Sequence, residues 1–376
     1  MDSIEQKVLA CSTALNPDVH QIKRLRFLLP LVKDVPHLID TAENEGLVYL
    51  LYRNLQKSEL LETLDSGDRK RLRSLYYRNI HFNLKLLKDL KAVLKRVNRE
   101  KIQVVILQGT VLLQQIYGDP GLRHLSDIDL WVLEESYPCL IDILTDMGYK
   151  KDPLFHNIYK RGSTTFDVHT HLLWSERIKS RSLLINKNQN HIYREIKKIE
   201  IEGQEAFCLS PSDQVLHLSL HALKHNVNSL IWLVDIKLLF TKWKIPDWLN
   251  LLDRARDLGQ EKTLSCILYL LQHLFDFYPP LEIHQTLEKR KLHFLEKKAL
   301  RQRMEKGFLP TWAPVILFYS GKGLGKRFSL IFETLFPRPE ILRQVFTDPP
   351  DLKVRQLYWR RIIQLLSKVR ISLKGF

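Results

Sequence analysis

The stretch IQVVILQGTVLLQQIYGDPGLRHLSDIDLWVL, residues 102–133, decides the fold class of this chain. It begins with a short uncharged run rich in β-branched residues, 102–107, which is typical of a buried strand. Gly109 ends that run, and TVLLQQIY is expected to form a helix before the turn GDPGLRHLS. DIDLWVL, residues 127–133, is predicted to be a second strand. This order predicts a small mixed sheet with helices packed against it.

More strands are predicted further along the chain. SYPCLIDILTDMGYK is expected to be a helix that ends at Gly148. FHNIYK (155–160) and TTFDVHTHL (164–172) then read as two strands joined by a short turn. KKIEIEG (197–203) and EAFCLS (205–210) predict a hairpin around Gly203.

The sequence on both sides of this core is helical in pattern. Apolar residues recur at three- and four-residue spacing before residue 100, most clearly from Arg69 to Arg99. A second helical region is expected to begin near Pro211, with Ser210 or Ser212 as its N-cap. We therefore predict a mostly helical α+β protein with an N-terminal helical region (1–100), an α/β core with a small mixed sheet and a hairpin (101–209), and a C-terminal helical region (210–376).

The excess of basic residues favours negatively charged partners. Lys and Arg outnumber Asp and Glu by 58 to 42 in the 376 residues, giving a formal charge of +16. This excess favours nucleotides, RNA or an acidic membrane face, although charge alone confers no sequence specificity. The four cysteines form no closely spaced pair and are predicted to be reduced thiols.

The sequence predicts a cytoplasmic protein with no transmembrane segment. The first residues lack the basic start and apolar run of a secretory signal, and charges interrupt every hydrophobic segment before it reaches roughly 20 residues. The last stretch, LYWRRIIQLLSKVRISLKGF, is a basic amphipathic helix that could make peripheral contact with an anionic membrane or dock on a partner. Packing onto its own domain is the favoured interpretation.

Two carboxylates carry the clearest chemical signal. Because strand side chains alternate, Asp127 and Asp129 point the same way while Ile128 and Leu130 enter the core. Like charges on one face repel each other unless a cation lies between them. Magnesium suits that position, since it takes oxygen ligands and keeps room for substrate phosphates.

A third carboxylate lies on a later strand. Asp167, His169 and His171 are expected to share one face of residues 164–172. If this strand lies beside 127–133, Asp167 completes a cluster that could hold two Mg²⁺ ions. Gly109 would let the backbone approach a phosphate, next to the free amides that open the following helix.

The stretch VVILQGTVLLQQIYGDPGLRHLSDIDLWV resembles the core of a little-characterised bacterial nucleotidyltransferase family in the polymerase-beta superfamily. FDVHTHL, LSPSDQVLHLSLHALKH, LIWLVDI and LFPRPEILR are similar to later parts of that family. The resemblance implies that Asp127 and Asp129 are catalytic metal ligands and that Asp167 is the third carboxylate and candidate general base. It also implies a phosphate-binding turn at Gly109 and Thr110.

The sequence departs from the family pattern in the phosphate-binding turn. Gln108 stands where the family usually has Lys, and Thr110 replaces the commoner Gly, Ser or Ala. Arg123 could replace part of the missing charge, because its planar group can hold phosphate in a bidentate way. The expected nucleotide-binding residues are therefore Gln108, Gly109, Thr110, Arg123 and Ser126.

Three functions stay open at this stage. The first is transfer of a nucleoside monophosphate from a nucleoside triphosphate such as ATP to an unknown acceptor hydroxyl on a small molecule, protein or RNA. The second, suggested by Gln108, is a catalytically inactive nucleotide- or RNA-binding regulator. The third is a metal-dependent hydrolase built on Asp167, His169 and His171.

Other polar and aromatic residues in the helical region are given structural roles. His217, His221 and His225 recur every four residues, and a row along one helix cannot easily surround a metal. They are interpreted as packing and hydrogen-bonding residues, and one of the rings could face the nucleotide. Trp232 and Asp235 are expected to fix the packing of their helices.

Overall fold

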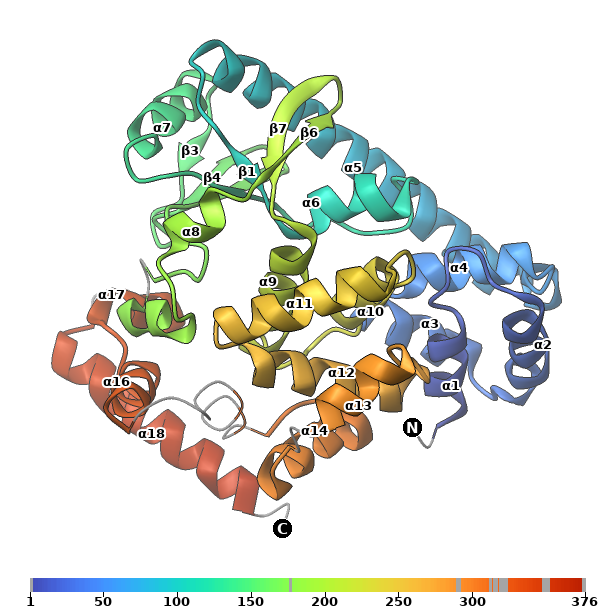
Figure 1. The fold of residues 1–376 in the computed structure, drawn as a ribbon. Helices are drawn as coiled ribbons and strands as arrows, with labels where there is room; N and C mark the ends of the chain where they lie inside the picture. Colours follow the sequence, from blue (N-terminus) through green and yellow to red (C-terminus); the bar gives the residue numbers. More distant parts are fainter. Residues whose placement is uncertain are drawn as a thin grey trace.

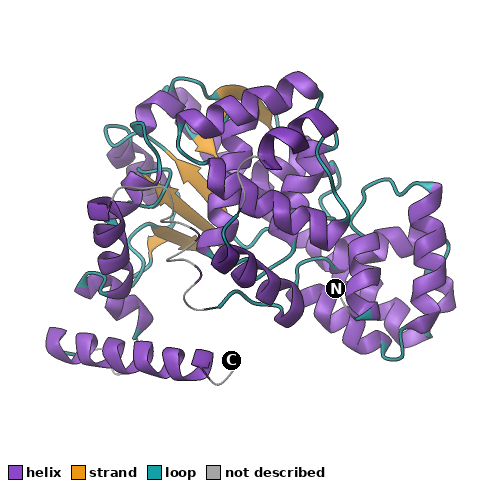
Figure 2. Ribbon diagram, turned by 60° about the horizontal axis from the view of Figure 1, so that its bottom comes forward, coloured by secondary structure: helices purple, strands orange, loops and turns teal. Residues whose placement is uncertain are grey.

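A computed structural model describes residues 3–175, 178–288, 292–310, 313, 317, 324–346 and 352–373. Within these residues the protein is mostly helical with one mixed sheet, which confirms the predicted α+β class (Figure 1). Figure 2 shows the strands enclosed by helices, with the N-terminal helices and the last helix at opposite sides of the molecule.

The sheet of the described residues has seven strands in the order β3-β4-β5-β2-β1-β7-β6. The central β2 pairs in parallel with β5 and antiparallel with β1. All the predicted strands form, and a short β3 is added at one edge. The bounds are β1 (Val105–Ile106), β2 (Ile128–Trp131), β3 (Lys150–Lys151), β4 (Ile158–Arg161), β5 (Thr164–His169), β6 (Lys197–Ile201) and β7 (Gln204–Cys208).

The strands are shorter than predicted, and the differences at β1 and β5 affect the site. β1 contains two residues, although Leu107 N still donates to Asp129 O at 3.0 Å beyond its end. β5 ends at His169, because the chain turns at residues 170–175. The side chains after His169 therefore do not continue the strand's alternation.

The N-terminal helices end with the long α5, which runs beside the sheet (Figure 1). Asp65 caps it by accepting from Asp68 N, and apolar residues such as Leu86 and Leu90 bury its inner face. The predicted helix from Arg69 to Arg99 is confirmed and begins slightly earlier. The helices are α1 (Ile4–Cys11), α2 (Val19–Leu28), α3 (Val35–Asn44), α4 (Val48–Lys57) and α5 (Ser66–Arg99), with short 3₁₀ turns at Leu29–Leu31 and Leu61–Thr63.

Short helices connect the strands of the core. The segment after β1 forms α6 and continues as a π-helical turn, and α7 ends just before Gly148, whose φ of 82° is left-handed. The elements are α6 (Gln108–Leu112), the π turn (Leu113–Tyr117), α7 (Tyr137–Asp146), a 3₁₀ helix (Lys179–Leu184) and α8 (Gln189–Tyr193).

The C-terminal region is helical, as predicted. Ser210 is the N-cap of α9 and accepts from Asp213 N. The helices are α9 (Pro211–Lys224), α10 (Ile231–Phe240), α11 (Ile245–Asp257), α12 (Glu261–Phe275), α13 (Leu281–Glu288), α14 (Phe294–Lys306), α16 (Leu324–Leu335), α17 (Pro339–Val345) and α18 (Val354–Leu373).

One hydrophobic cluster joins the three sequence regions, from Val8 in α1 through the sheet to Leu300 in α14. The division at residues 100 and 209 stays a prediction. The cysteines are free thiols, three of them buried, as the sequence predicts.

The predicted packing of the C-terminal helix onto its own domain is seen at its first turn. Leu357 joins a small cluster with Leu342 and Leu352, while Trp359 and Leu366 are exposed. No helix among the described residues is long and apolar enough to span a bilayer. Residues 374–376 of the predicted helix lie outside the described residues.

Candidate active site

The register of two parallel strands places two of the predicted carboxylates side by side. Asp129 on β2 pairs with Asp167 on β5. The flanking residues Ile128 and Phe166 are fully buried, so the core fixes which way the two carboxylates point. Asp127 directly precedes β2 and lines the same cavity.

His169 completes the most compact polar group. Its Nε2 lies 3.3 Å from Asp129 Oδ1 and 3.4 Å from Asp167 Oδ1, and the ring is buried. One ligand atom from each of these three residues lies within 4.8 Å of the others, which is close enough to share a metal ion. Asp127 is not part of this compact group, although it lines the same cavity.

The electrostatics of the carboxylates fit a bound cation. Burial, followed by the charge of Asp129, raises the pKa of Asp127 to about 7. Burial also raises the pKa of Asp129, and the hydrogen bond from His169 opposes that rise. A divalent ion between these oxygens would relieve their repulsion and their loss of hydration. The carboxylate oxygens suit magnesium or manganese, whereas a direct imidazole ligand would favour zinc.

The cavity beside the carboxylates measures about 270 Å³. The loop before β2 and the start of α6 form one wall, with Gln108, Gly109, Arg123, Leu125 and Ser126. The opposite wall comes from the turn after β5 and from the ends of α9 and α10, with Trp174, His221, Lys224, His225 and Trp232.

The sequence analysis did not single out Trp174 and Lys224. Trp174 has a left-handed φ of 57°, which turns the chain after β5 back toward α9. Lys224 Nζ lies 3.5 Å from the centre of the Trp174 ring, a cation–π contact. Lys224 also lowers the pKa of Asp129 through its charge. A cation therefore lines the cavity even though Gln108 stands where the family has Lys.

Arg123 is held by another side chain. Its Nε and Nη2 lie 3.0–3.2 Å from both carboxylate oxygens of Asp235, and Tyr117 Oη donates to Asp235 Oδ1 at 2.7 Å. Asp235 thus ties the loop before β2 to α10, which agrees with its expected role in packing. Arg123 lines the cavity, but its guanidinium edge toward Asp235 is already satisfied.

The loop from Gly118 to Ser126 is also anchored on α5. Asn83 Nδ2 donates to Pro120 O at 2.6 Å and to Arg123 O at 2.7 Å, and Leu125 N donates to Asn83 Oδ1 at 3.2 Å. Asn79 donates to Gly121 O at 2.9 Å. These buried amides lie on the apolar face of α5 and carry no local sequence signal for a site.

The predicted phosphate turn has a different geometry from the expected one. Gln108 has the left-handed φ of 54°, whereas Gly109 is helical. A Cβ on Gly109 would lie 3.0 Å from Leu125 Cδ2 and 3.4 Å from Arg123 Cζ, so a larger residue there would press on the loop before β2. Thr110 is buried outside the residues that line the cavity. Ser126 lines it and donates to Asp127 Oδ1 at 2.7 Å.

The three histidines of α9 divide between the core and the cavity. Burial lowers the pKa of His217 to about 3, and its ring stacks on Trp174 at 5.2 Å. Neither ring nitrogen of His217 has a hydrogen-bond partner among the described residues, so its role is packing alone. His221 and His225 line the cavity together with Trp232.

His171 does not join Asp167 and His169, contrary to the prediction that they share one face. The strand ends at His169, and His171 Nδ1 accepts from Leu173 N in the following turn. His171 lines a separate cavity near Glu134 and Asn186. The ligand set expected for a hydrolase is therefore not assembled.

Comparison with known proteins agrees with the resemblance carried by the β1–β2 segment. Residues 32–276, more than half of the chain, match the family described as uncharacterised nucleotidyltransferase. No curated protein matches the chain. The match covers all of the carboxylate cavity and stops before α16–α18. The chain belongs to this nucleotidyltransferase family.

Proposed function

We propose that the protein transfers a nucleoside monophosphate from a nucleoside triphosphate to an acceptor hydroxyl. The observation that carries the proposal is the pairing of Asp129 with Asp167 across β2 and β5, with Asp127 in the same cavity. Nucleotidyl transfer needs carboxylates beside a cavity that accepts phosphates, and this cavity also holds aromatic and cationic groups.

Asp127, Asp129 and Asp167 would hold Mg²⁺, with His169 touching two of these carboxylates from within the core. The bound ions would neutralise the charge that develops on the phosphates. Lys224 adds positive charge on the opposite wall. Trp232, His221 and His225 line the same cavity and could contact a nucleobase through their rings.

The reaction balances as a displacement at the α-phosphorus. The acceptor oxygen forms a bond to that phosphorus as the bond to the bridging oxygen of the β-phosphate breaks. Pyrophosphate leaves with the electron pair, and the hydroxyl proton passes to Asp167 as general base. Arg123 and Ser126 would hold the loop that carries Asp127, through Asp235 and through the hydrogen bond to Asp127.

Replacement of a cluster carboxylate tests the proposal. Asp129→Asn and Asp127→Asn should each lower transfer at least about 100-fold, because each removes a charge from the group that faces the phosphates. The measurement is incorporation of label from the four α-labelled nucleoside triphosphates with Mg²⁺ and cell extract. Asp142→Asn, an exposed carboxylate on α7, is the control and should retain activity.

Circular dichroism and urea denaturation would show whether each variant stays folded. Full transfer by either folded cluster variant would refute the assignment. Transfer that survives in Asp127→Asn but is lost in Asp129→Asn would restrict the metal site to Asp129, Asp167 and His169.

A second candidate is a nucleotide- or RNA-binding regulator without transfer. Gln108 favours it, because the residue lines the cavity where the family usually has Lys. Binding of a labelled triphosphate with Mg²⁺ but no label on any acceptor would support the regulator. Loss of that binding in Lys224→Gln would identify the cation on which it depends.

A further inference from the structure

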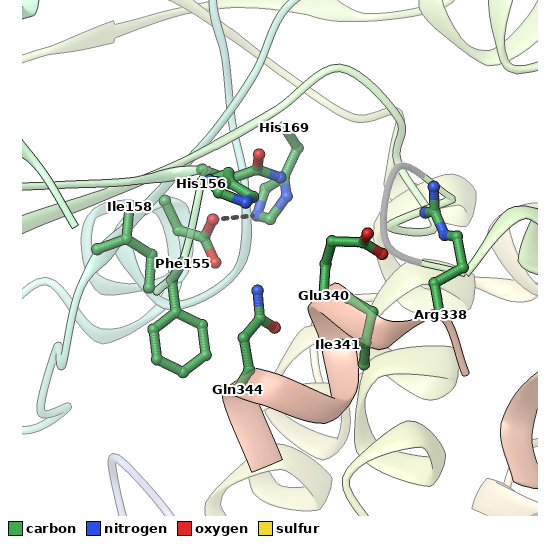
Figure 3. A pocket seen from close by; sticks show the side chains of 10 residues that line it. Phe155, His156, Ile158, His169, Arg338, Glu340, Ile341 and Gln344 are labelled. Atoms are coloured by element: carbon green, nitrogen blue, oxygen red, sulfur yellow. Dashed lines mark ion pairs between the residues drawn. The ribbon is translucent and has the colours of Figure 1, made fainter. Parts of the chain in front are cut away.

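A second cavity lies on the other side of Asp167. It measures about 160 Å³ and is lined by the segment before β4, by Asp167 and His169, and by α17. Figure 3 shows Glu340 and Gln344 of α17 across the cavity from His169, whose Nε2 lies 3.4 Å from Asp167 Oδ1. Asp167 thus lines both cavities, whereas Asp127 and Asp129 line only the first of the two.

Hydrogen bonds hold the α17 wall against the core. Gln344 Nε2 donates to Leu154 O at 2.8 Å, at the entrance to β4. On the preceding helix α16, Glu333 accepts from the backbone N and the Oγ of Ser180 at 2.8 and 2.6 Å. These contacts join segments more than 150 residues apart. The second cavity is therefore part of the packed structure.

The α17 wall is contributed by a helix far along the chain from the strands that carry the carboxylates. Acceptor pockets are built by the helical regions around a catalytic core rather than by its strands. The second cavity therefore combines Asp167 of β5 with a wall from the C-terminal helices.

We propose that this cavity binds the acceptor, and that the acceptor is a compact hydroxyl compound that carries both an ammonium and a carboxylate group, as hydroxy amino acids do. The proposal rests on the proposed nucleotidyl transfer. The volume is below the range of roughly 300–1,000 Å³ that drug-sized ligands occupy, which excludes a nucleotide-sized acceptor from full burial.

The lining groups match such a molecule. Asp167 at the inner end would accept the proton of the hydroxyl. Glu340 and Arg338 supply one charge of each sign on the α17 side, where an ammonium and a carboxylate could be bound (Figure 3). Phe155 and Ile341 supply apolar contact between the two ends.

The hydroxyl oxygen would attack the α-phosphorus from the side of the second cavity as pyrophosphate leaves toward the first. The proton lost by the hydroxyl goes to Asp167, which lies between the two cavities. This arrangement places nucleophile and leaving group on opposite sides of the reacting phosphorus, as in-line displacement requires.

Binding of four small probes tests the inference without nucleotide or metal. L-serine carries both charges, ethanolamine only the ammonium, glycerate only the carboxylate, and glycerol neither. Saturation-transfer NMR on the full chain should show serine binding at least about tenfold more tightly than each of the other three, since each charge-assisted contact contributes roughly a factor of ten. Equal binding of the four probes, or no binding of serine, would overturn the proposal.

Variants on α17 locate the bound probe. Glu340→Gln should weaken serine binding about tenfold and leave glycerate binding unchanged. Arg338→Gln should also weaken serine binding about tenfold, but it should leave ethanolamine binding unchanged. Ile341→Trp should block all the probes by filling the cavity. Glu305→Gln, an exposed acid on α14, is the control. Unchanged serine binding in both Glu340→Gln and Ile341→Trp would contradict the assignment.

Transfer assays separate this inference from the proposed function. With labelled triphosphate and Mg²⁺, serine should accept label in the unmodified protein, and Glu340→Gln should raise the KM for serine about tenfold with little change in kcat. Asp129→Asn should lose transfer but still bind serine. Transfer to a macromolecule in extract, with no serine binding, would support nucleotidyl transfer and refute the small acceptor.

Discussion

Two sets of carboxylates, buried or half-buried, differ in the groups that neutralise their charge. Asp213 and Asp235 each receive two or more hydrogen bonds from one arginine, Arg254 and Arg123 respectively. By contrast, the ion pairs found for Asp129 and for Asp167 among the described residues are with the same imidazole, that of His169.

The presence or absence of a paired arginine distinguishes carboxylates that hold helices together from carboxylates that could bind a metal ion. A carboxylate that only holds helices together is stable when its cation is built into the fold. A carboxylate cluster that faces a cavity and raises the pKa of Asp127 to about 7 carries a cost that a bound cation would remove. The missing counter-charge, more than the acidic residues themselves, indicates a site.

Removing the arginine from a structural pair should have the largest effect on stability. Arg254→Ala leaves Asp213 buried without its cation, since the Asp213 side chain is 1% exposed. We expect a loss of about 3–5 kcal/mol in the free energy of unfolding, measured by urea denaturation. Arg256→Ala on the same helix removes a solvent-exposed arginine that pairs with Asp253 and Glu261, and it should cost less than about 1 kcal/mol. Similar losses in the two variants would contradict the distinction.

The strands and the acidic pair could be predicted because their signals are local. Alternation over 127–133 determines which side chains enter the core. The pattern of residues 164–172 indicated Asp167 as a third carboxylate without knowledge that β2 and β5 pair. The end of a strand could not be predicted in the same way. His171 follows the same alternation in sequence, but the chain turns after His169, and that turn depends on Trp174 packing against α9.

Contacts between distant segments could not be predicted. Asn79 and Asn83 have no sequence signal, because a buried amide on a helix is explained only by the loop that it binds. The same holds for Lys224, whose place opposite the carboxylates depends on how α9 packs on the sheet. α17 adjoins Asp167 only through folding across more than 150 residues.

Metal binding should change stability by an intermediate amount. If Mg²⁺ supplies the missing counter-charge, a concentration about 100-fold above its Kd should stabilise the protein by about 2.7 kcal/mol through binding to the folded state. The measurement is urea denaturation with and without Mg²⁺ after treatment with EDTA. Asp129→Asn should lose most of this gain, whereas Asp142→Asn should keep it. An equal gain in Asp129→Asn would place the ion elsewhere.

The smallest expected effect is the pH dependence of the metal-free protein. The pKa of Asp127 rises from 3.8 to about 7 on folding, mainly through burial, so the folded state holds the proton more tightly than the unfolded chain. The stability contributed by this group is fully present below about pH 3.8 and is lost as the pH rises through about 7.

The free energy of unfolding in EDTA should therefore fall between pH 5 and pH 8. Asp127→Asn should reduce that fall by on the order of 1 kcal/mol, which allows for screening by water in the cavity. An unchanged slope in Asp127→Asn would mean that this carboxylate is already neutralised without metal. It would then belong with Asp213 and Asp235, and the contrast between paired and unpaired carboxylates would rest on Asp129 and Asp167 alone.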